Sequence, residues 1–125
     1  VAVEDVGQVV VEGLNGMAYV DQLDGDAVKI QQGDVVVEGE VDRIYRAAEA
    51  VVLEGHGGMV VRGAGGEVST VVWNPWVEKS ARLGDMAPEE YRCMVCVETA
   101  WAGGKDQVIL PGEAATLQTW LRPLA

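Results

Sequence analysis

The stretch VVWNPWVEKSARLGDMAPEEYRCMVCVETA, residues 71–100, decides the fold and holds the first candidate site residue. Two runs typical of strands, one ending at Trp73 and one covering residues 91–99, flank a loop rich in tryptophan and charge. The second run is almost wholly apolar until it reaches Glu98. Because a carboxylate is rarely buried without a partner, a glutamate in such a strand is a candidate catalytic group. The alternative interpretation is a glutamate at the end of the strand that points to water.

The turn that follows Trp73 holds three further candidates. Pro75 disfavours the helical conformation for Asn74, so the chain is extended there and Trp73 and Trp76 splay around a fixed corner. One interpretation is that the two indole rings, together with Asn74, form a wall on which a sugar ring stacks. The other is that both tryptophans anchor the core or its rim.

A second group of candidates lies upstream, in residues 39–45. If this segment is a strand, Arg43 lies on one face and Asp42 lies on the other, beside Ile44. An aspartate next to an isoleucine on one face indicates a strand edge or a polar cavity. Arg43 and Arg46 could bind an anion, although a solvated surface is the more common explanation for such a cluster.

The rest of the chain alternates short apolar runs with turns rich in glycine, asparagine and aspartate, which predicts about ten short strands. The expected strands cover residues 8–12, 17–23, 27–30, 35–37, 39–45, 50–54, 59–62, 67–73, 91–99, 107–110 and 114–121. A short helix or an irregular loop is expected at 77–82, and one helical turn at 87–90. Because no strand–helix–strand spacing is present, the prediction is an all-β, antiparallel β-sandwich that forms a single domain over residues 1–125.

Composition and charge exclude several classes of function. The 125 residues are 49% hydrophobic, and a formal net charge of −11 argues against nucleic acid as a partner. The sequence has no run of 18 apolar residues and no visible secretory signal, so we expect no membrane partner and a cytoplasmic location.

Two cysteines, Cys93 and Cys96, form the only CxxC pattern. On a strand, positions three apart lie about 10 Å from each other on opposite faces, too far for a disulfide. With His56 as the only histidine, a closed zinc site would lack ligands. We therefore interpret the pair as two reduced core residues, which fits a cytoplasmic protein, and we expect no metal and no cofactor.

Five segments of the chain together resemble the C-terminal part of the hexose-6-phosphate mutarotases (glucose-6-phosphate 1-epimerases) of the aldose 1-epimerase family. They are VVVEGLNGMAYVD (9–21), EVDRIY (40–45), VVWNPWVEKSARLGDM (71–86), EYRCMVCVETA (90–100) and LPGEAATL (110–117). The resemblance implies an isomerase that interconverts the anomers of a hexose or hexose phosphate. It also implies part of a galactose-mutarotase-like supersandwich, a large antiparallel β-sandwich. By resemblance, Glu98 stands at the general-base position and Asp42 at a substrate-contacting position.

The sequence departs from the family pattern at the acid. In the family, a histidine in a His-Thr-Tyr-Phe segment protonates the ring oxygen, and that segment lies just ahead of the position where Val1 begins. The upstream arginines for phosphate and half of the sandwich are also outside this chain, so we expect a truncated form that is nearly inactive alone. We expect it to pair with a copy of itself or with a complementing N-terminal chain. The alternative is a non-catalytic carbohydrate-binding or protein-interaction module derived from the enzyme.

Overall fold

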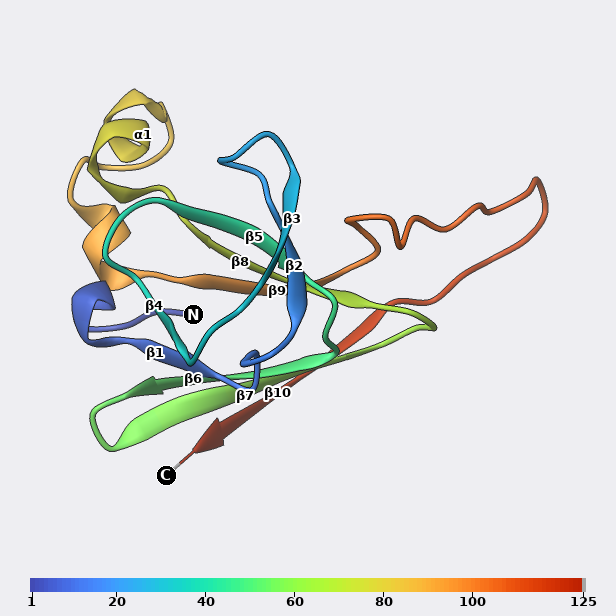
Figure 1. Cartoon of the computed structure of the whole chain (residues 1–125), viewed down its shortest axis with the longest axis horizontal. Coiled ribbons are helices and arrows are strands. Elements are labelled where there is room, and N and C mark those ends of the chain that lie inside the picture. The colour runs from blue at the N-terminus through green and yellow to red at the C-terminus, as the bar shows by residue number, and fades with distance from the viewer. Residues whose placement is uncertain (125) are drawn as a thin grey trace.

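The chain folds into two antiparallel sheets of five strands each that pack face to face (Figure 1). The computed structural model describes residues 1–124. In chain order the elements are η1 (Val6–Gln8), β1 (Val10–Glu12), β2 (Ala18–Asp21), β3 (Ala27–Ile30), β4 (Val35–Val36), β5 (Val41–Tyr45), β6 (Glu49–Glu54), β7 (Gly57–Ala64), β8 (Ser69–Asn74), α1 (Trp76–Arg82), η2 (Glu90–Cys93), β9 (Cys96–Ala100) and β10 (Gln118–Leu124). The first sheet has the order β10-β7-β6-β1-β4, and the second has the order β3-β2-β5-β8-β9. The predicted all-β, antiparallel sandwich is confirmed.

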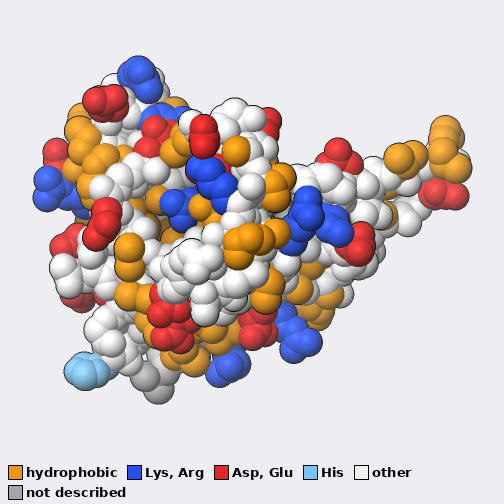
Figure 2. Space-filling model, viewed as in Figure 1, with side chains coloured by type: hydrophobic (Ala, Val, Ile, Leu, Met, Phe, Trp, Pro, Cys, Tyr) orange, Lys and Arg blue, Asp and Glu red, His pale blue; other side chains and the backbone are white. Residues whose placement is uncertain are grey.

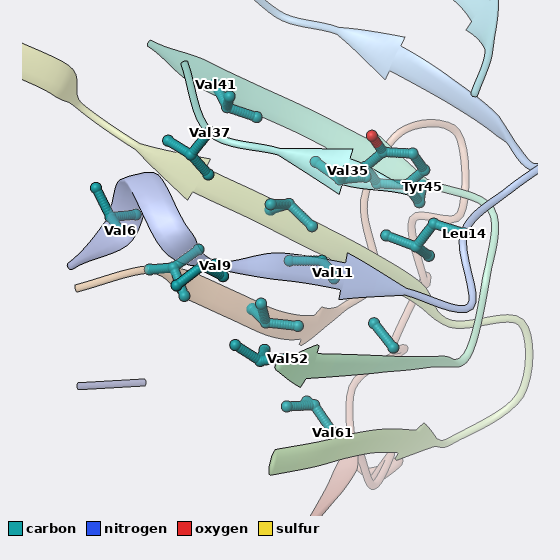
Figure 3. Packing of buried hydrophobic residues seen from close by; sticks show 14 of the residues in the cluster. Val6, Val9, Val11, Leu14, Val35, Val37, Val41, Tyr45, Val52 and Val61 are labelled. Atoms are coloured by element: carbon teal, nitrogen blue, oxygen red, sulfur yellow. The ribbon is translucent and has the colours of Figure 1, made fainter. Parts of the chain in front are cut away.

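Small branched side chains fill the space between the two sheets (Figure 3). Val11, Val52 and Val61 come from the first sheet, and Val41 and Tyr45 come from the second. Each valine that leaves water contributes about 1.5–3 kcal/mol, so a row of them holds the sheets together without any phenylalanine. The alternation that the sequence shows on these strands is therefore the pattern of a face packed on a core.

Three neighbouring strands of the second sheet position the candidate site. Asp42 on β5 lies opposite Trp73 on β8, and Trp73 lies opposite Cys96 on β9. Glu98 lies opposite Val71, two residues further along the same pair of strands. Residues directly opposite each other project to the same side of a sheet, so Asp42, Trp73, Cys96 and Glu98 share one face.

Three predicted strands differ from the structure, and the one expected at 114–121 begins only at Gln118 and runs to Leu124. The first part of the predicted strand at 91–99 forms η2, and the regular strand β9 begins only at Cys96. Residues 107–110 form no strand; they belong to an extended arm, residues 101–117, that projects from the sandwich (Figure 1). Residues 108–110 are apolar, but a short apolar run forms a strand only where a neighbouring strand pairs with it.

The two sheets approach each other most closely where β9 crosses β7. Gly63 on β7 lies against Thr99, so close that a Cβ atom added at Gly63 would stand 2.7 Å from the Thr99 Oγ1 atom and closer still to its methyl carbon. Glycine is required here because the Thr99 side chain occupies the space that a Cβ atom at position 63 would need. The backbone conformation of Gly63 is one that any residue can adopt. This contact fixes the position of β9 over β7.

We predict that Gly63→Ala lowers the free energy of unfolding by about 1–3 kcal/mol, because the added methyl group overpacks the contact with Thr99. Urea denaturation of the chain measures the change. Gly39→Ala is the matched control, since none of the described atoms lies within 4 Å of the added Cβ there. Gly63→Ala combined with Thr99→Ala should cost less than the sum of the two single changes. Additive costs would contradict the contact.

Candidate functional site

One face of the second sheet, the side turned away from the first sheet, gathers the polar candidates. We call it the site face and define it by Asp42, Trp73, Cys96 and Glu98. The residues that alternate with them, such as Val72, point into the core and are fully buried. Asp42 and Glu98 lie on strands separated by β8, two strand spacings of about 4.8 Å each, with the Trp73 indole on the strand between them.

Asp42 is held by polar neighbours from two other elements. Its Oδ1 atom accepts a hydrogen bond of 2.6 Å from the Gln22 side-chain amide, which follows β2. Its Oδ2 atom lies 3.9 Å from the Lys79 ammonium group, which is 3.3 Å from Glu40. Because Lys79 comes from α1 and Gln22 from the end of β2, the carboxylate is fixed from two sides. It remains partly accessible, with 19% of the side chain exposed.

Trp73 is half-buried on the site face next to this carboxylate. The Lys79 Nζ atom lies 5.9 Å from the centroid of the indole ring. A cation at this distance is attracted to the electron-rich ring face and helps to hold the indole in place. The ring therefore offers an apolar surface beside a fixed carboxylate.

Glu98 is exposed on β9, the outer strand of the second sheet among the described residues. The structure thus matches the interpretation in which this side chain points to water. Cys96 precedes it by two positions on the same face and is half-buried, while Cys93 lies exposed on η2. The interpretation of both cysteines as core residues is therefore wrong. Burial raises the pKa of the Cys96 thiol, and the negative charge of Glu98 raises it further.

Asn74 and Trp76 do not lie on the site face. Asn74 is fully buried, and its side-chain amide donates to the carbonyl oxygens of Tyr91 and Met94 at 2.8 and 2.9 Å. Its Oδ1 atom accepts a hydrogen bond of 2.9 Å from the Trp76 N–H, and the Trp76 ring packs 5.3 Å from the Tyr91 ring. The amide group of Asn74 thus joins the end of β8 to the segment before β9, and its Oδ1 atom holds the turn that leads into α1.

Arg43 lies on the opposite face of β5 from Asp42, as its alternation predicts. It donates at 3.3 Å to the side chains of Gln31 and Tyr45, and it lies 5.0 Å above the Tyr19 ring. Burial raises the pKa of the Tyr45 hydroxyl, which donates to Gln31 at 2.7 Å. The structure therefore places Asp42, Trp73 and Glu98 on one face of the second sheet and Arg43 in a separate polar cluster.

Gln22 and Glu40 are site neighbours that the sequence did not indicate. They reach Asp42 and Lys79 only because β2 lies beside β5 and α1 returns over the end of β5, and no local pattern encodes either fact. His56 is exposed in the turn between β6 and β7, within the other sheet. Among residues 1–124, no group of three or more histidine, cysteine or acidic side chains is placed to hold a metal ion, and no helix is long and apolar enough to cross a membrane.

The fold and this face define an antiparallel β-sandwich protein with two carboxylates and an indole on the outside of one sheet. The chain belongs to the aldose 1-epimerase family, whose model matches residues 4–122. A protein of Cenchrus ciliaris with the name "Putative glucose-6-phosphate 1-epimerase" is 39% identical over 115 residues, which cover 89% of this chain and 35% of that protein. A protein of the same name from Escherichia coli is 29% identical over 110 residues, which cover 85% of this chain and 37% of that protein. The chain thus spans about a third of the length of these curated relatives.

Solved structures agree with the fold. The crystal structure of a "putative mutarotase" from Salmonella typhimurium matches 77% of this chain and 34% of its own chain, with a TM-score of 0.70 and 26% identity. A second solved chain matches 97% of this chain and 43% of its own length with a TM-score of 0.73, and at 21% identity it shows the fold alone. The resemblance to mutarotases and the sandwich fold that it implied are confirmed.

The adjacency of Glu98 and Cys96 can be measured through thiol reactivity. We predict that Glu98→Gln speeds the alkylation of Cys96 at pH 8 by about two- to tenfold, because removing the negative charge lowers the pKa of the thiol and each pKa unit changes the thiolate fraction about tenfold. Mass spectrometry of the chain treated with iodoacetamide gives the rate. The exposed Cys93 is the internal control, and an equal change at both cysteines would contradict the arrangement.

Proposed function

We propose that this chain is the sugar-binding and base-carrying part of an aldose mutarotase that acts on a hexose or a hexose phosphate. The observation that carries the proposal is the common face of Asp42, Trp73 and Glu98 in a chain that belongs to the aldose 1-epimerase family. Asp42 and Trp73 are half-buried and Glu98 is exposed, so solvent reaches all three side chains.

Glu98 is the proposed general base. Its carboxylate would accept the proton of the C1 hydroxyl group while the bond between C1 and the ring oxygen breaks and the ring oxygen takes a proton from an acid. The carbonyl carbon then rotates, and the ring closes on its other face as the two proton transfers reverse. Carboxylates are common general bases in enzyme active sites.

Asp42 and Trp73 are the proposed binding residues. The carboxylate of Asp42 has acceptor capacity left beyond its bond with Gln22, and sugar hydroxyl groups are donors that suit it. The indole of Trp73 offers its face to the C–H groups of the ring. Together they would hold the sugar across β5 and β8 with its anomeric carbon toward β9.

Lys79 is the proposed contact for a phosphate group. It is the cation nearest to Asp42 among the described side chains, whereas Arg43 lies on the other face of the strand. The formal net charge of −11 would repel a phosphate ester, so a local cation is needed to bind one. Lys79 would exchange its contact with Glu40 for the phosphate.

The proton donor for the ring oxygen is proposed to come from outside this chain. The only histidine, His56, lies in a turn of the other sheet, and the described part of the site face holds no histidine. Loss of one member of an acid–base pair costs about 10²–10⁴ in rate, so the chain alone should turn over slowly or not at all.

Sugar binding tests the site face directly. We predict that calorimetry detects glucose 6-phosphate binding by the chain, and that Asp42→Asn and Trp73→Ala each weaken it about fivefold or more, the loss of about one hydrogen bond or stacking contact. Arg43→Gln is the control, since the other face of β5 should not affect the sugar. No heat with any hexose or hexose phosphate would contradict the proposal, and equal losses for Asp42 and Arg43 would contradict the assignment.

Catalysis requires the rest of the fold. We predict that residues 1–125, placed in the Escherichia coli relative in exchange for its matching part, support mutarotation of glucose 6-phosphate, and that Glu98→Gln in this fusion lowers the rate by about 10²-fold or more. Polarimetry gives the rate. The chain alone should not exceed the buffer rate. Unchanged turnover in the Glu98→Gln fusion would remove Glu98 as the base.

A second candidate function is a carbohydrate-binding or protein-interaction module without catalysis. The exposed position of Glu98 and the distant His56 favour it, because a base without an acid can still bind a hydroxyl group. Sugar binding by the chain together with a fusion that is folded but inactive would support this function.

A further inference from the structure

Trp120 of β10 differs from the other three tryptophans of the chain. Trp73 lies near a lysine ammonium group, Trp76 packs on a tyrosine ring, and Trp101 donates a hydrogen bond of 2.7 Å to a main-chain carbonyl. Within residues 1–124, no aromatic ring stacks on Trp120 and no cation lies over its ring. Its side chain is 50% exposed, so a face of the indole is open to a ligand.

Trp120 lies on the outside of the first sheet. The next residue, Leu121, lies opposite the core residue Val61 and points inward, so Trp120 points outward. Trp120 lies opposite Arg62 of β7, and Arg62 lies opposite Glu49 of β6. These three outward-pointing side chains form a row across three neighbouring strands. The site face is on the outside of the other sheet, so this row belongs to a separate surface.

A second arginine lies on the same side of β10. Arg122 is two residues beyond Trp120 and therefore projects to the same face, diagonal to Arg62 with the two Cα atoms about 7–8 Å apart. Within residues 1–124, no carboxylate forms an ion pair with Arg122. The Nε atom of Arg62 lies 3.9 Å from the Glu49 carboxylate, too far for a hydrogen bond, so its donors are left for a ligand.

A groove of about 680 Å³ joins these side chains. Its lining includes Glu49, Arg62, Trp120 and Arg122. Val60, an outward-pointing residue that its neighbours bury, adds an apolar part to the lining. The volume falls within the range of about 300–1,000 Å³ that is usual for sites of small organic molecules. Figure 2 shows basic side chains beside hydrophobic ones along the lower edge of the molecule, where β7 and β10 run in Figure 1.

The two guanidinium groups favour an anion, and the open indole favours a flat ring. A guanidinium group presents parallel N–H groups that match two oxygens of a phosphate. Because the chain as a whole has a formal net charge of −11, an anion binds only where cations are concentrated. Nucleotide bases stack well on aromatic side chains, since every base has a π-face. The net charge opposes a polynucleotide with its many phosphates, so the groove suits a single nucleotide.

We propose that this groove on the outside of the first sheet binds a nucleoside monophosphate. The base stacks on the exposed indole of Trp120, and the phosphate accepts hydrogen bonds from Arg62 and Arg122. Glu49 lies at the far end of the row, where its carboxylate can accept a hydrogen bond from a hydroxyl or amino group of the ligand. The groove shares no residue with the site face, so this binding goes beyond the proposed sugar chemistry and does not depend on it.

Calorimetry of the chain with adenosine 5′-monophosphate tests the site. We expect Trp120→Leu, Arg62→Gln and Arg122→Gln each to weaken binding about fivefold or more, because each removes one stacking or ionic contact. Trp120→Phe keeps a flat ring and should retain most of the binding. Arg82→Gln on α1 is the matched control, with the same change of net charge, and all four side chains are exposed, so the variants should fold. No heat with this nucleotide, or equal weakening by the Arg82 and Arg122 changes, would overturn the proposal.

Simpler ligands separate the two halves of the site. Adenosine, which lacks the phosphate, and ribose 5-phosphate, which lacks the base, should each bind at least about tenfold more weakly than adenosine 5′-monophosphate. Ribose 5-phosphate that binds as tightly as the nucleotide would remove the stacking on Trp120 and overturn the proposal.

The sugar site serves as a further control. Saturating glucose 6-phosphate should leave the affinity for the nucleotide unchanged, and competition between the two ligands would overturn the assignment to a nucleotide. Asp42→Asn and Glu98→Gln, both on the other sheet, should also leave nucleotide binding unchanged. Failure of the sugar site and failure of this groove are therefore distinguishable.

Discussion

The pairing of β8 with β5 on one side and β9 on the other is the constraint on which the candidate site depends. Side chains alternate between the two faces of a sheet, so a shift of one residue in either pairing would move a whole set of side chains to the other face. Val72, buried between the sheets, and Trp73, outside them, fix the register of β8. Asp42 and Glu98 lie on the same face only because β5 and β9 both pair with β8 in this register.

The turn after β8 stabilises the pairing of β8 with β9 at the end where β9 begins. Asn74 donates two hydrogen bonds to the segment before β9 and accepts a third from the Trp76 N–H within the turn, while the Trp76 ring packs on Tyr91. Asn74 and Trp76, which the sequence suggested as part of a sugar-binding wall, therefore hold in place the strand that carries Trp73. A buried side chain with all its strong partners inside the protein shapes the site without touching a ligand.

The sequence predicted the sandwich, most of its strands and the opposite faces of Asp42 and Arg43, because all of these follow from period-two alternation. It could not predict that residues 107–110 lack a partner strand or that η2 interrupts the run before Cys96, since pairing is a property of the whole sheet. The contacts of Asp42 with Gln22 and Lys79 also depend on strand order. Local pattern and resemblance were enough to select Asp42 and Glu98 as candidates. The residues that surround them could be identified only from the folded structure.

The exposure of Glu98 follows from the position of β9 at the edge of its sheet. An interior strand would have neighbours on both sides, and the side chains beside Glu98 would then enclose the site on one flank as Trp73 and Asp42 do on the other.

The central claim is that the face bearing Asp42, Trp73 and Glu98 binds a sugar. The most direct measurement is a series of ¹H–¹⁵N correlation spectra of the labelled chain during titration with glucose 6-phosphate. The account predicts shifts for the amides of residues 42, 73 and 96–98 and for one indole N–H. Shifts absent from these positions, or confined to Gln31 and Tyr45 on the other face of the sheet, would contradict it.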